Sequence, residues 1–220
     1  AYSVMMGDPL GSFYGYRYKG VYQNVEETYA VNTSGQRILD IDGNPVVMKN
    51  GDQKVYPGDA RYEDVNGDGV IDENDIVYLG NSNPTLTGGL NFTLRYKKVS
   101  LVAAFHGRAG QKVINQARMD MENMRGKNNQ SVAVLRRWRS EGDDTDIPRA
   151  LYDKGYNYLG SDRFVEDASF LRLKTVTLKY QMPAKWMKAI GVNKLELYAT
   201  GYDMFVWTKY KGQDPEVNLK

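Results

Sequence analysis

Residues 90–106 have the sequence LNFTLRYKKVSLVAAFH, and this stretch decides the fold class. Apolar residues recur at every second position on both sides of Lys97-Lys98, which is the period of a β-strand. A two-residue turn there would pair Tyr96 with Val99, and each further pair on that face would also be apolar. Lys-Lys is an unusual turn, because Asn-Gly is preferred, so the register rests on the apolar pattern. The stretch predicts a hairpin with one face formed by Leu90, Phe92, Leu94, Leu101 and Phe105, and with Asn91, Thr93 and Arg95 on the other.

Three further segments predict strands. Tyrosines recur at every second position in Ser12–Gln23, and apolar residues alternate in Lys194–Met204 and near the end of Ser169–Gln181. Pro183 ends the segment Ser169–Gln181, because proline cannot donate a hydrogen bond to a sheet. The residues that follow, Ala184–Ile190, have the spacing of a short amphipathic helix.

The connections between these strands are of very unequal length. Lys97-Lys98 is a tight turn and Met182–Asn193 is moderate, whereas Asn24–Thr85 and Gly107–Ala168 are long and polar. Loops of that size are uncommon in compact soluble domains. Short periplasmic turns that alternate with long outer loops are typical of outer-membrane barrels. The predicted fold class is all-β: a portion of an antiparallel transmembrane β-barrel with long extracellular loops.

The composition excludes several other classes. A formal net charge of +2, with basic residues scattered, argues against a nucleic-acid-binding protein. The absence of cysteine excludes a disulfide framework and a thiolate metal site. No apolar run approaches the roughly 18 residues of a membrane-spanning helix, and Ala1–Gly7 lacks the basic start of a signal peptide. Barrel strands need only alternate apolar residues, so the hydrophilic average is compatible with that fold.

Residues 64–75, DVNGDGVIDEND, match the template of a calcium-binding loop. Oxygen-bearing side chains fall at positions 1, 3, 5, 9 and 12 of the template, and Gly69 occupies position 6, where the chain turns sharply. Position 12 is Asp rather than the usual Glu, which shortens its reach. The alternative is an Asp- and Gly-rich turn without metal. The predicted calcium ligands are Asp64, Asn66, Asp68, the carbonyl of Val70, Asp72 and Asp75.

No catalytic site is predicted. His106 is the only histidine, so a transition-metal site or a histidine-based triad has no second partner in the local sequence. The acidic stretch Glu141–Asp146 could be interpreted as the carboxylate pair of a glycosidase, but a solvated loop is the simpler interpretation. We expect the chain not to be an enzyme.

Several short stretches together resemble the SusC/RagA family of TonB-linked outer-membrane transporters. In order they are GSFYGY at 11–16 with GVYQ at 20–23, GDARY at 58–62 leading into the calcium-type loop, GNSNP at 80–84 with TGG at 87–89, SDRFVED at 161–167 with LRLK at 171–174, and WTKYKGQDPE at 207–216. Their order and spacing resemble the C-terminal part of such transporters, from about Gly11 to Val217. Two departures are Lys98, where the family often has Gly, and Tyr202-Asp203, where a Gln-Asn pair is common.

The resemblance implies that residues 1–220 are the C-terminal part of a TonB-dependent outer-membrane β-barrel of about 22 strands, including an extracellular calcium-type loop at 64–75. The signal peptide, plug domain and TonB-contacting segment of the family would then lie upstream, and a last strand beyond Lys220. The implied function is import of glycans or peptides in a Gram-negative bacterium. The implied partners are a SusD-like surface lipoprotein, TonB through the missing N-terminal part, and outer-membrane lipid, with no nucleic acid.

Aromatic residues in the predicted outer segments are candidates for binding cargo, because their rings can stack on sugars or peptide side chains. These candidates are Tyr152, Tyr156, Tyr158 and Trp207. Two alternative functions are a soluble, calcium-stabilised surface β module that binds glycans, such as a β-sandwich, and a secreted glycoside-acting enzyme. The one-sided apolar face of the hairpin is compatible with the β module. The loop asymmetry and the family-like stretches favour the importer.

Overall fold

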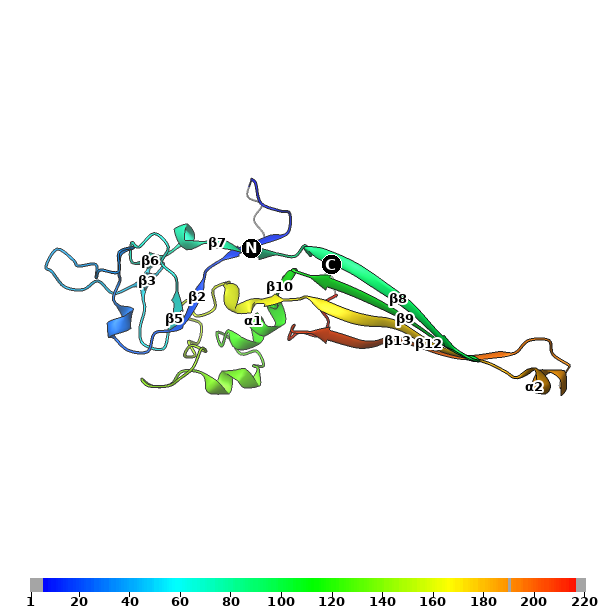
Figure 1. The fold of residues 1–220 in the computed structure, drawn as a ribbon. Helices are drawn as coiled ribbons and strands as arrows, with labels where there is room; N and C mark the ends of the chain where they lie inside the picture. The colour runs from blue at the N-terminus through cyan, green and yellow to red at the C-terminus, as the bar shows by residue number, and fades with distance from the viewer. Residues whose placement is uncertain (1–5, 190, 217–220) are drawn as a thin grey trace. The chain divides into compact units, whose positions relative to one another are not determined.

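A computed structural model describes residues 6–189 and 191–216, which form two compact units (Figure 1). The first, here called the loop unit, comprises residues 1–82 and 113–166. The second, here called the sheet unit, comprises residues 83–112 and 167–220. The chain therefore passes between the units three times, and each unit is built from two separate stretches of sequence.

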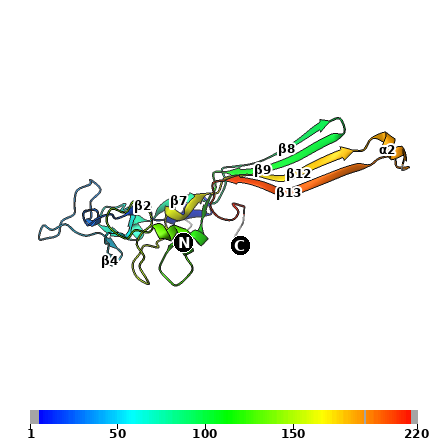
Figure 2. The same cartoon turned by 90° about the horizontal axis from the view of Figure 1, so that it is seen from below.

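The sheet unit is a four-stranded antiparallel sheet. It contains β8 (Leu86–Tyr96), β9 (Val99–Ala109), β12 (Phe170–Gln181) and β13 (Glu196–Thr208), in the order β13-β12-β9-β8. Figure 2 shows the four strands side by side, with the short helix α2 (Ala184–Ala189) at the same end as the β8–β9 turn. The predicted strands at 169–181 and 194–204 are confirmed as β12 and β13, and β13 continues to Thr208.

The hairpin register predicted from the sequence is confirmed. Tyr96 pairs with Val99, Leu94 with Leu101 and Leu90 with Phe105. Of the two turn residues, only Lys97 adopts a left-handed backbone, with φ of 53°. The turn is therefore not the type I′ turn that would require two such residues.

A register shift between Leu173 and Thr175 changes the alternation within β12. On one side of it, Leu178 pairs with Leu101; on the other, Leu173 pairs with Phe105. The odd-numbered leucines at 171 and 173 therefore share a face with the even-numbered Val176 and Leu178. The shift keeps one face of all four strands apolar.

That apolar face is exposed. Leu90 is 63% exposed, Leu94 60% and Leu197 54%, and every residue of β8 is exposed. Within the described residues, no helix is long and apolar enough to cross a membrane. An apolar surface this continuous normally marks contact with lipid or with another protein.

The loop unit contains small sheets rather than unstructured loops. Its antiparallel pairs join β1 (Ser12–Gly15) to β7 (Val77–Asn81) and β2 (Tyr18–Val21) to β5 (Ala60–Tyr62). A three-stranded sheet has the order β4-β3-β6, and the helical segments are short. The remaining elements are β3 (Lys49–Asn50), β4 (Gln53–Lys54), β6 (Val70–Ile71), β10 (Lys112–Ile114), α1 (Gln116–Glu122), β11 (Val165–Asp167) and 3₁₀ turns at Glu26–Thr28, Glu73–Asp75, Val132–Arg136 and Asp162–Phe164.

The prediction of one continuous strand over Ser12–Gln23 is wrong. The segment divides into β1 and β2, which pair with different partners. The break falls at Tyr16, whose N–H donates to the carbonyl of Gly160 at 3.0 Å, and a side chain at Gly15 would collide with that carbonyl. A distant segment thus takes over the hydrogen bonding of the strand at this point.

A core of aromatic and aliphatic side chains holds the loop unit together. Its buried members are Tyr22, Ala30, Met48, Val55, Ala60, Tyr62 and Ile71. The long polar links predicted from the sequence therefore fold on their own core. A second, smaller cluster contains Met124, Val134 and Ile147.

Candidate functional sites

The calcium-type loop is held in shape by its own backbone amides. The Asp64 carboxylate accepts hydrogen bonds from the N–H groups of Gly67 at 2.7 Å and Gly69 at 2.8 Å. Asp68 accepts one from the N–H of Val70 at 2.8 Å. Gly67 and Gly69 both have positive φ, and a side chain at Gly67 would collide with the backbone of Thr33. The glycines are therefore required for this tight path.

Asp75, at the last position of the loop, is fully buried. Its two oxygens accept hydrogen bonds from the N–H groups of Val65 at 2.7 Å and Asp72 at 2.9 Å. Ile71 packs in the core, and β6 pairs with β3, so the loop is fixed to the unit by its middle as well as its ends.

The donor set of this loop suits a hard cation, because it consists of carboxylate, amide and carbonyl oxygens. Among the described ion pairs, none involves Asp75, although buried carboxylates are usually paired with a cation or a metal. Across residues 6–189 and 191–216, no three or more His, Asp or Glu side chains converge closely enough to form a metal-holding group. The residue types fit calcium, but their side chains are turned toward backbone amides.

The three candidate tyrosines lie in the loop unit but differ in exposure and contacts. Tyr152 is 61% exposed. Tyr158 is half-buried and lies beneath the guanidinium of Arg125, 4.3 Å from the ring centroid. The hydroxyl of Tyr156 donates to Asp52 at 2.9 Å, which raises the pKa of this tyrosine.

Tyr156 also lines a cavity of about 180 Å³. Arg149 and Asp59 form part of its wall, together with Tyr56 and Asn157. Of the candidate tyrosines, only Tyr156 lines it. The cavity therefore combines aromatic and hydrogen-bonding groups on one unit.

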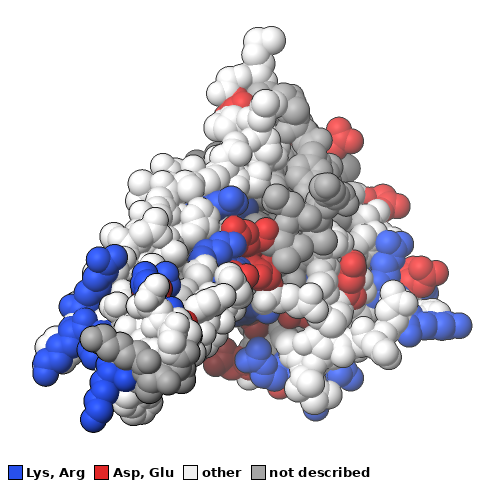
Figure 3. Space-filling view, turned by 90° about the vertical axis from the view of Figure 1, so that its right-hand side faces the viewer, with Lys and Arg blue, Asp and Glu red and all other residues white. Residues whose placement is uncertain are grey.

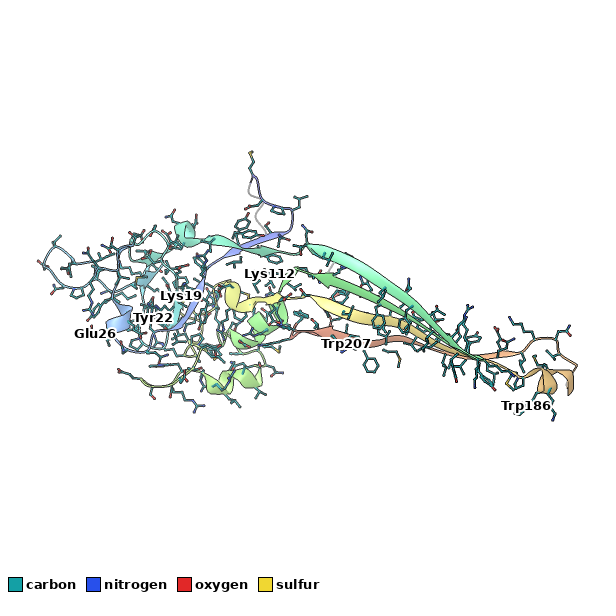
Figure 4. The ribbon with its side chains drawn as sticks, viewed as in Figure 1. Lys19, Tyr22, Glu26, Lys112, Trp186 and Trp207 are labelled. Atoms are coloured by element: carbon teal, nitrogen blue, oxygen red, sulfur yellow. The ribbon has the colours of Figure 1, made fainter. Side chains whose placement is uncertain are left out.

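The fourth candidate, Trp207, belongs to the sheet unit (Figure 4). It lies in β13 opposite Leu171, on the apolar face, and is 52% exposed. Its ring is 6.1 Å from that of Phe205. The neighbours of Trp207 are therefore apolar side chains of the sheet unit, and the three tyrosines belong to the other unit.

An ion pair between the half-buried Arg149 and the buried Asp59 organises the cavity wall and was not predicted from the sequence. The Arg149 guanidinium donates to both oxygens of Asp59, at 2.7 and 3.2 Å. Asn157 donates to the same carboxylate at 3.3 Å and accepts from the N–H of Ala60 at 2.8 Å. Asp59 is part of the GDARY stretch, and this was its only signal in the sequence.

Two residues of the SDRFVED stretch, Arg163 and Glu166, belong to a second network of ion pairs. Glu122 is buried and accepts from Arg163 at 2.8 Å and from Arg118 at 2.9 Å. Arg118 also donates to Glu166 at 3.2 Å. Two arginines and two glutamates thereby join α1 to the segment 161–166.

In the sheet unit, Arg172 of the LRLK stretch is buried and pairs with the segment after β13. Its guanidinium lies 2.5 Å from Asp214 and 3.1 Å from Glu216. His106 lies 3.8 Å from Glu216, an acidic partner that its local sequence does not contain. These contacts join the LRLK and WTKYKGQDPE stretches in one structural cluster on the face opposite the leucines.

The acidic stretch Glu141–Asp146 forms a turn. Asp143 accepts from the N–H groups of Arg139 at 2.8 Å and Ser140 at 3.1 Å, and these hydrogen bonds lower the pKa of its carboxyl group. Glu141 and Asp144 are exposed. The arrangement is that of a solvated turn.

Comparison with curated proteins finds similar sequences among TonB-dependent receptors. The chain is 33% identical to TonB-dependent receptor P26 of Formosa agariphila over 213 residues, which are 97% of this chain and 20% of that protein. It is 30% identical to TonB-dependent receptor SusC of Bacteroides thetaiotaomicron over 170 residues, 76% of this chain and 16% of that protein. The chain therefore spans about a fifth of the curated relatives it matches. No protein-family model matches it.

Among solved structures, the fold is similar to part of the RagAB peptide importer in its closed-closed state. The TM-score is 0.65 at 24% identity, over 96% of this chain and 22% of that one. The open-open state of the same importer gives a TM-score of 0.61 at 21% identity. At these identities the similarity concerns the fold alone.

Proposed function

This chain is homologous to the SusC/RagA-type TonB-dependent receptors, and from this premise we propose that it is part of an outer-membrane importer of glycans or peptides. The sheet unit is a portion of the transmembrane barrel wall. The loop unit lies on the extracellular side. The chain supplies the C-terminal part of the barrel, and the whole protein works with TonB and a SusD-like lipoprotein in a Gram-negative bacterium.

The observation that carries this proposal is the exposed apolar face of the sheet. Leu94 pairs with Leu101 and Leu101 with Leu178, so leucines continue across three strands, and those of β8 and β12 are exposed. Alternation of apolar and polar faces is what a strand needs when lipid lies on one side and a polar lumen on the other. The opposite face carries Asn91, Thr93 and Arg95, which suits a lumen or a plug.

The loop unit is the part we propose to meet cargo and lipoprotein. The proposed stacking residues in this unit are Tyr152, Tyr156 and Tyr158. Trp207 lies in β13 on the face that we propose to contact lipid, so it is set apart from them. Aromatic rings suit both sugar rings and peptide side chains. No catalytic step is proposed, since transport leaves the cargo chemically unchanged.

Deletion of the full-length gene tests the proposed function. We expect the mutant to lose growth on, and uptake of, at least one glycan or peptide that the parent imports, and a plasmid copy to restore both. Unchanged uptake of every candidate cargo, together with hydrolysis of one of them by the purified protein, would establish the enzyme alternative instead.

We also propose that the loop at 64–75 binds calcium, through Asp64, Asn66, Asp68, the Val70 carbonyl, Asp72 and Asp75. The support is the ligand spacing and the full burial of the Asp75 carboxylate. A bound cation would offset the repulsion among the four carboxylates proposed as ligands.

Calorimetry with the full-length receptor tests the calcium proposal. We expect millimolar or tighter calcium binding that is lost in the double variant Asp64→Asn/Asp68→Asn. The matched control is Asp144→Asn/Asp146→Asn, which removes two exposed carboxylates from another turn and should keep the calcium signal. Absence of a calcium signal in the wild-type protein would refute the metal site and leave the import proposal intact.

A further inference from the structure

Cationic side chains gather at the end of the sheet that carries the β8–β9 turn and α2. Figure 3 looks onto this end, and Lys and Arg side chains crowd its lower left. Over residues 95–100 and 178–197, Glu196 is the one acid in the sequence, and it pairs with Lys194 at 3.1 Å. Among the described side chains, the exposed lysines of the turn and of the connection through α2 are Lys97, Lys98, Lys185 and Lys194, and β12 carries the exposed Lys179.

Backbone hydrogen bonds bring these lysines together from three parts of the sequence. The N–H of Gln181 donates to the carbonyl of Lys98 at 2.8 Å, which ties the hairpin turn to the end of β12. The N–H of Met182 donates to the carbonyl of Leu195 at 3.0 Å, which ties the start of the α2 connection to the residue before β13. The lysines therefore share one end of one sheet.

Aromatic side chains lie at the same level. Tyr96 and Tyr180 both pair with Val99, so they occupy the last row of the apolar face, and both are exposed. Trp186 is 62% exposed on α2, beyond the strand ends (Figure 4). Tyrosine and tryptophan are enriched where the apolar core of a membrane meets its headgroups. Lysines just beyond such a row lie at the depth of those headgroups.

The polar face at the same end of the sheet also carries two cations, and these can be compared with the lysines of the turn and of α2. Arg95 and Lys179 are both opposite Ser100, on the polar face. In the proposed barrel these two cations point away from lipid. A lipid that binds this end should therefore depend on the lysines of the turn and of α2, and not on Arg95 or Lys179.

We propose that this end of the sheet binds the headgroups of anionic phospholipids. The proposal rests on the proposed function for the placement of the sheet in a membrane, and it adds a ligand class at a defined end. Lysines near a membrane surface attract anionic headgroups, and the aromatic row fixes the depth at which they do so. Because the sheet end bears the short turn, the lipids belong to the periplasmic leaflet.

Native mass spectrometry of the full-length receptor with phosphatidylglycerol and phosphatidylcholine tests the proposal. We expect the wild-type protein to retain phosphatidylglycerol preferentially. Lys98→Gln/Lys185→Gln should weaken that retention by about fivefold per lysine at low salt. The matched variant Arg95→Gln/Lys179→Gln, which removes the same charge from the polar face, should retain the lipid as the wild type does.

Equal retention of the two lipids by the wild type, or equal loss in both variants, would overturn the proposal. Preferential binding of anionic peptidoglycan fragments in place of phosphatidylglycerol would also overturn it. Cargo uptake measured with the same variants separates the two proposals. A receptor that imports cargo without a lipid preference contradicts only this inference, whereas one that binds lipid but imports nothing contradicts the proposed function.

Discussion

At the scale of single residues, charged side chains inside the loop unit join segments that are far apart in the sequence. Asp59 is 6% exposed and has Arg149, Asn157 and a backbone amide as partners. The two side-chain partners are far from Asp59 in the sequence: Arg149 follows it by 90 residues and Asn157 by 98. No local pattern could therefore have predicted the pair. The oxygen spacing of 64–75 could be predicted because the proposed ligands are neighbours in one turn.

Replacement of Arg149 by alanine should destabilise the loop unit by about 3 kcal/mol. This is the low end of the cost of breaking a buried ion pair, because the arginine side chain is 32% exposed. Hydrogen exchange of the Ala60 and Tyr22 amides in the full-length protein measures the loss. Arg136→Ala, at an exposed arginine, is the control, and equal protection in both variants would contradict the prediction.

The buried tyrosines should make the loop unit sensitive to alkali. Burial raises the pKa of Tyr22 from 10.0 to about 12, and burial also raises the pKa values of Tyr18 and Tyr62. A raised folded-state pKa contributes stability that is complete below pH 10 and is lost as the pH rises toward 12. Absorbance of ionised tyrosine and circular dichroism should therefore change together in that interval. Tyr22→Phe should move the transition to higher pH, while Tyr152→Phe, at an exposed tyrosine, should not.

At the scale of elements, the β8–β9 hairpin follows from the sequence because a tight turn and a strict alternation fix its register. The same reasoning fails for Ser12–Gln23, since its break depends on hydrogen bonding to Gly160 and not on anything within the segment. It also fails to reveal the register shift near Lys174, where strict alternation would place Leu171 and Leu173 on the wrong face. Local sequence patterns therefore predict elements whose hydrogen bonds join residues near in the sequence. They miss features that depend on hydrogen bonds to distant segments.

Lysine substitution along β8 should distinguish the two faces. Leu90→Lys places a charge on the proposed lipid face and should cost about 2–4 kcal/mol near the middle of the membrane, whereas Asn91→Lys on the polar face should cost much less. Urea titration of the full-length protein folded in liposomes measures both. Similar costs at the two neighbouring positions would show that the sheet does not separate lipid from lumen.

At the scale of the whole molecule, the orientation that we propose for the full-length protein predicts where a protease can reach it. Trypsin added to intact cells should cleave the loop unit at exposed sites such as Lys154, and should spare the Lys97-Lys98 turn, which the proposed topology puts on the periplasmic side. Mass spectrometry of the released peptides identifies the cuts. Cleavage at Lys97-Lys98 with the loop unit intact would reverse the proposed topology.

The three passages of the chain between its units constrain the order of assembly. β9 ends at Ala109 and its neighbour β12 begins at Phe170, with residues 113–166 of the loop unit between them. Closing a free chain of that length costs entropy, and such non-local pairing slows folding. Once the loop unit has folded, residues 113–166 are no longer a free chain, and the entropy cost of bringing β12 to β9 is smaller. The β8–β9 hairpin should therefore form early from local contacts, and its docking onto β12 should wait until the loop unit has collapsed.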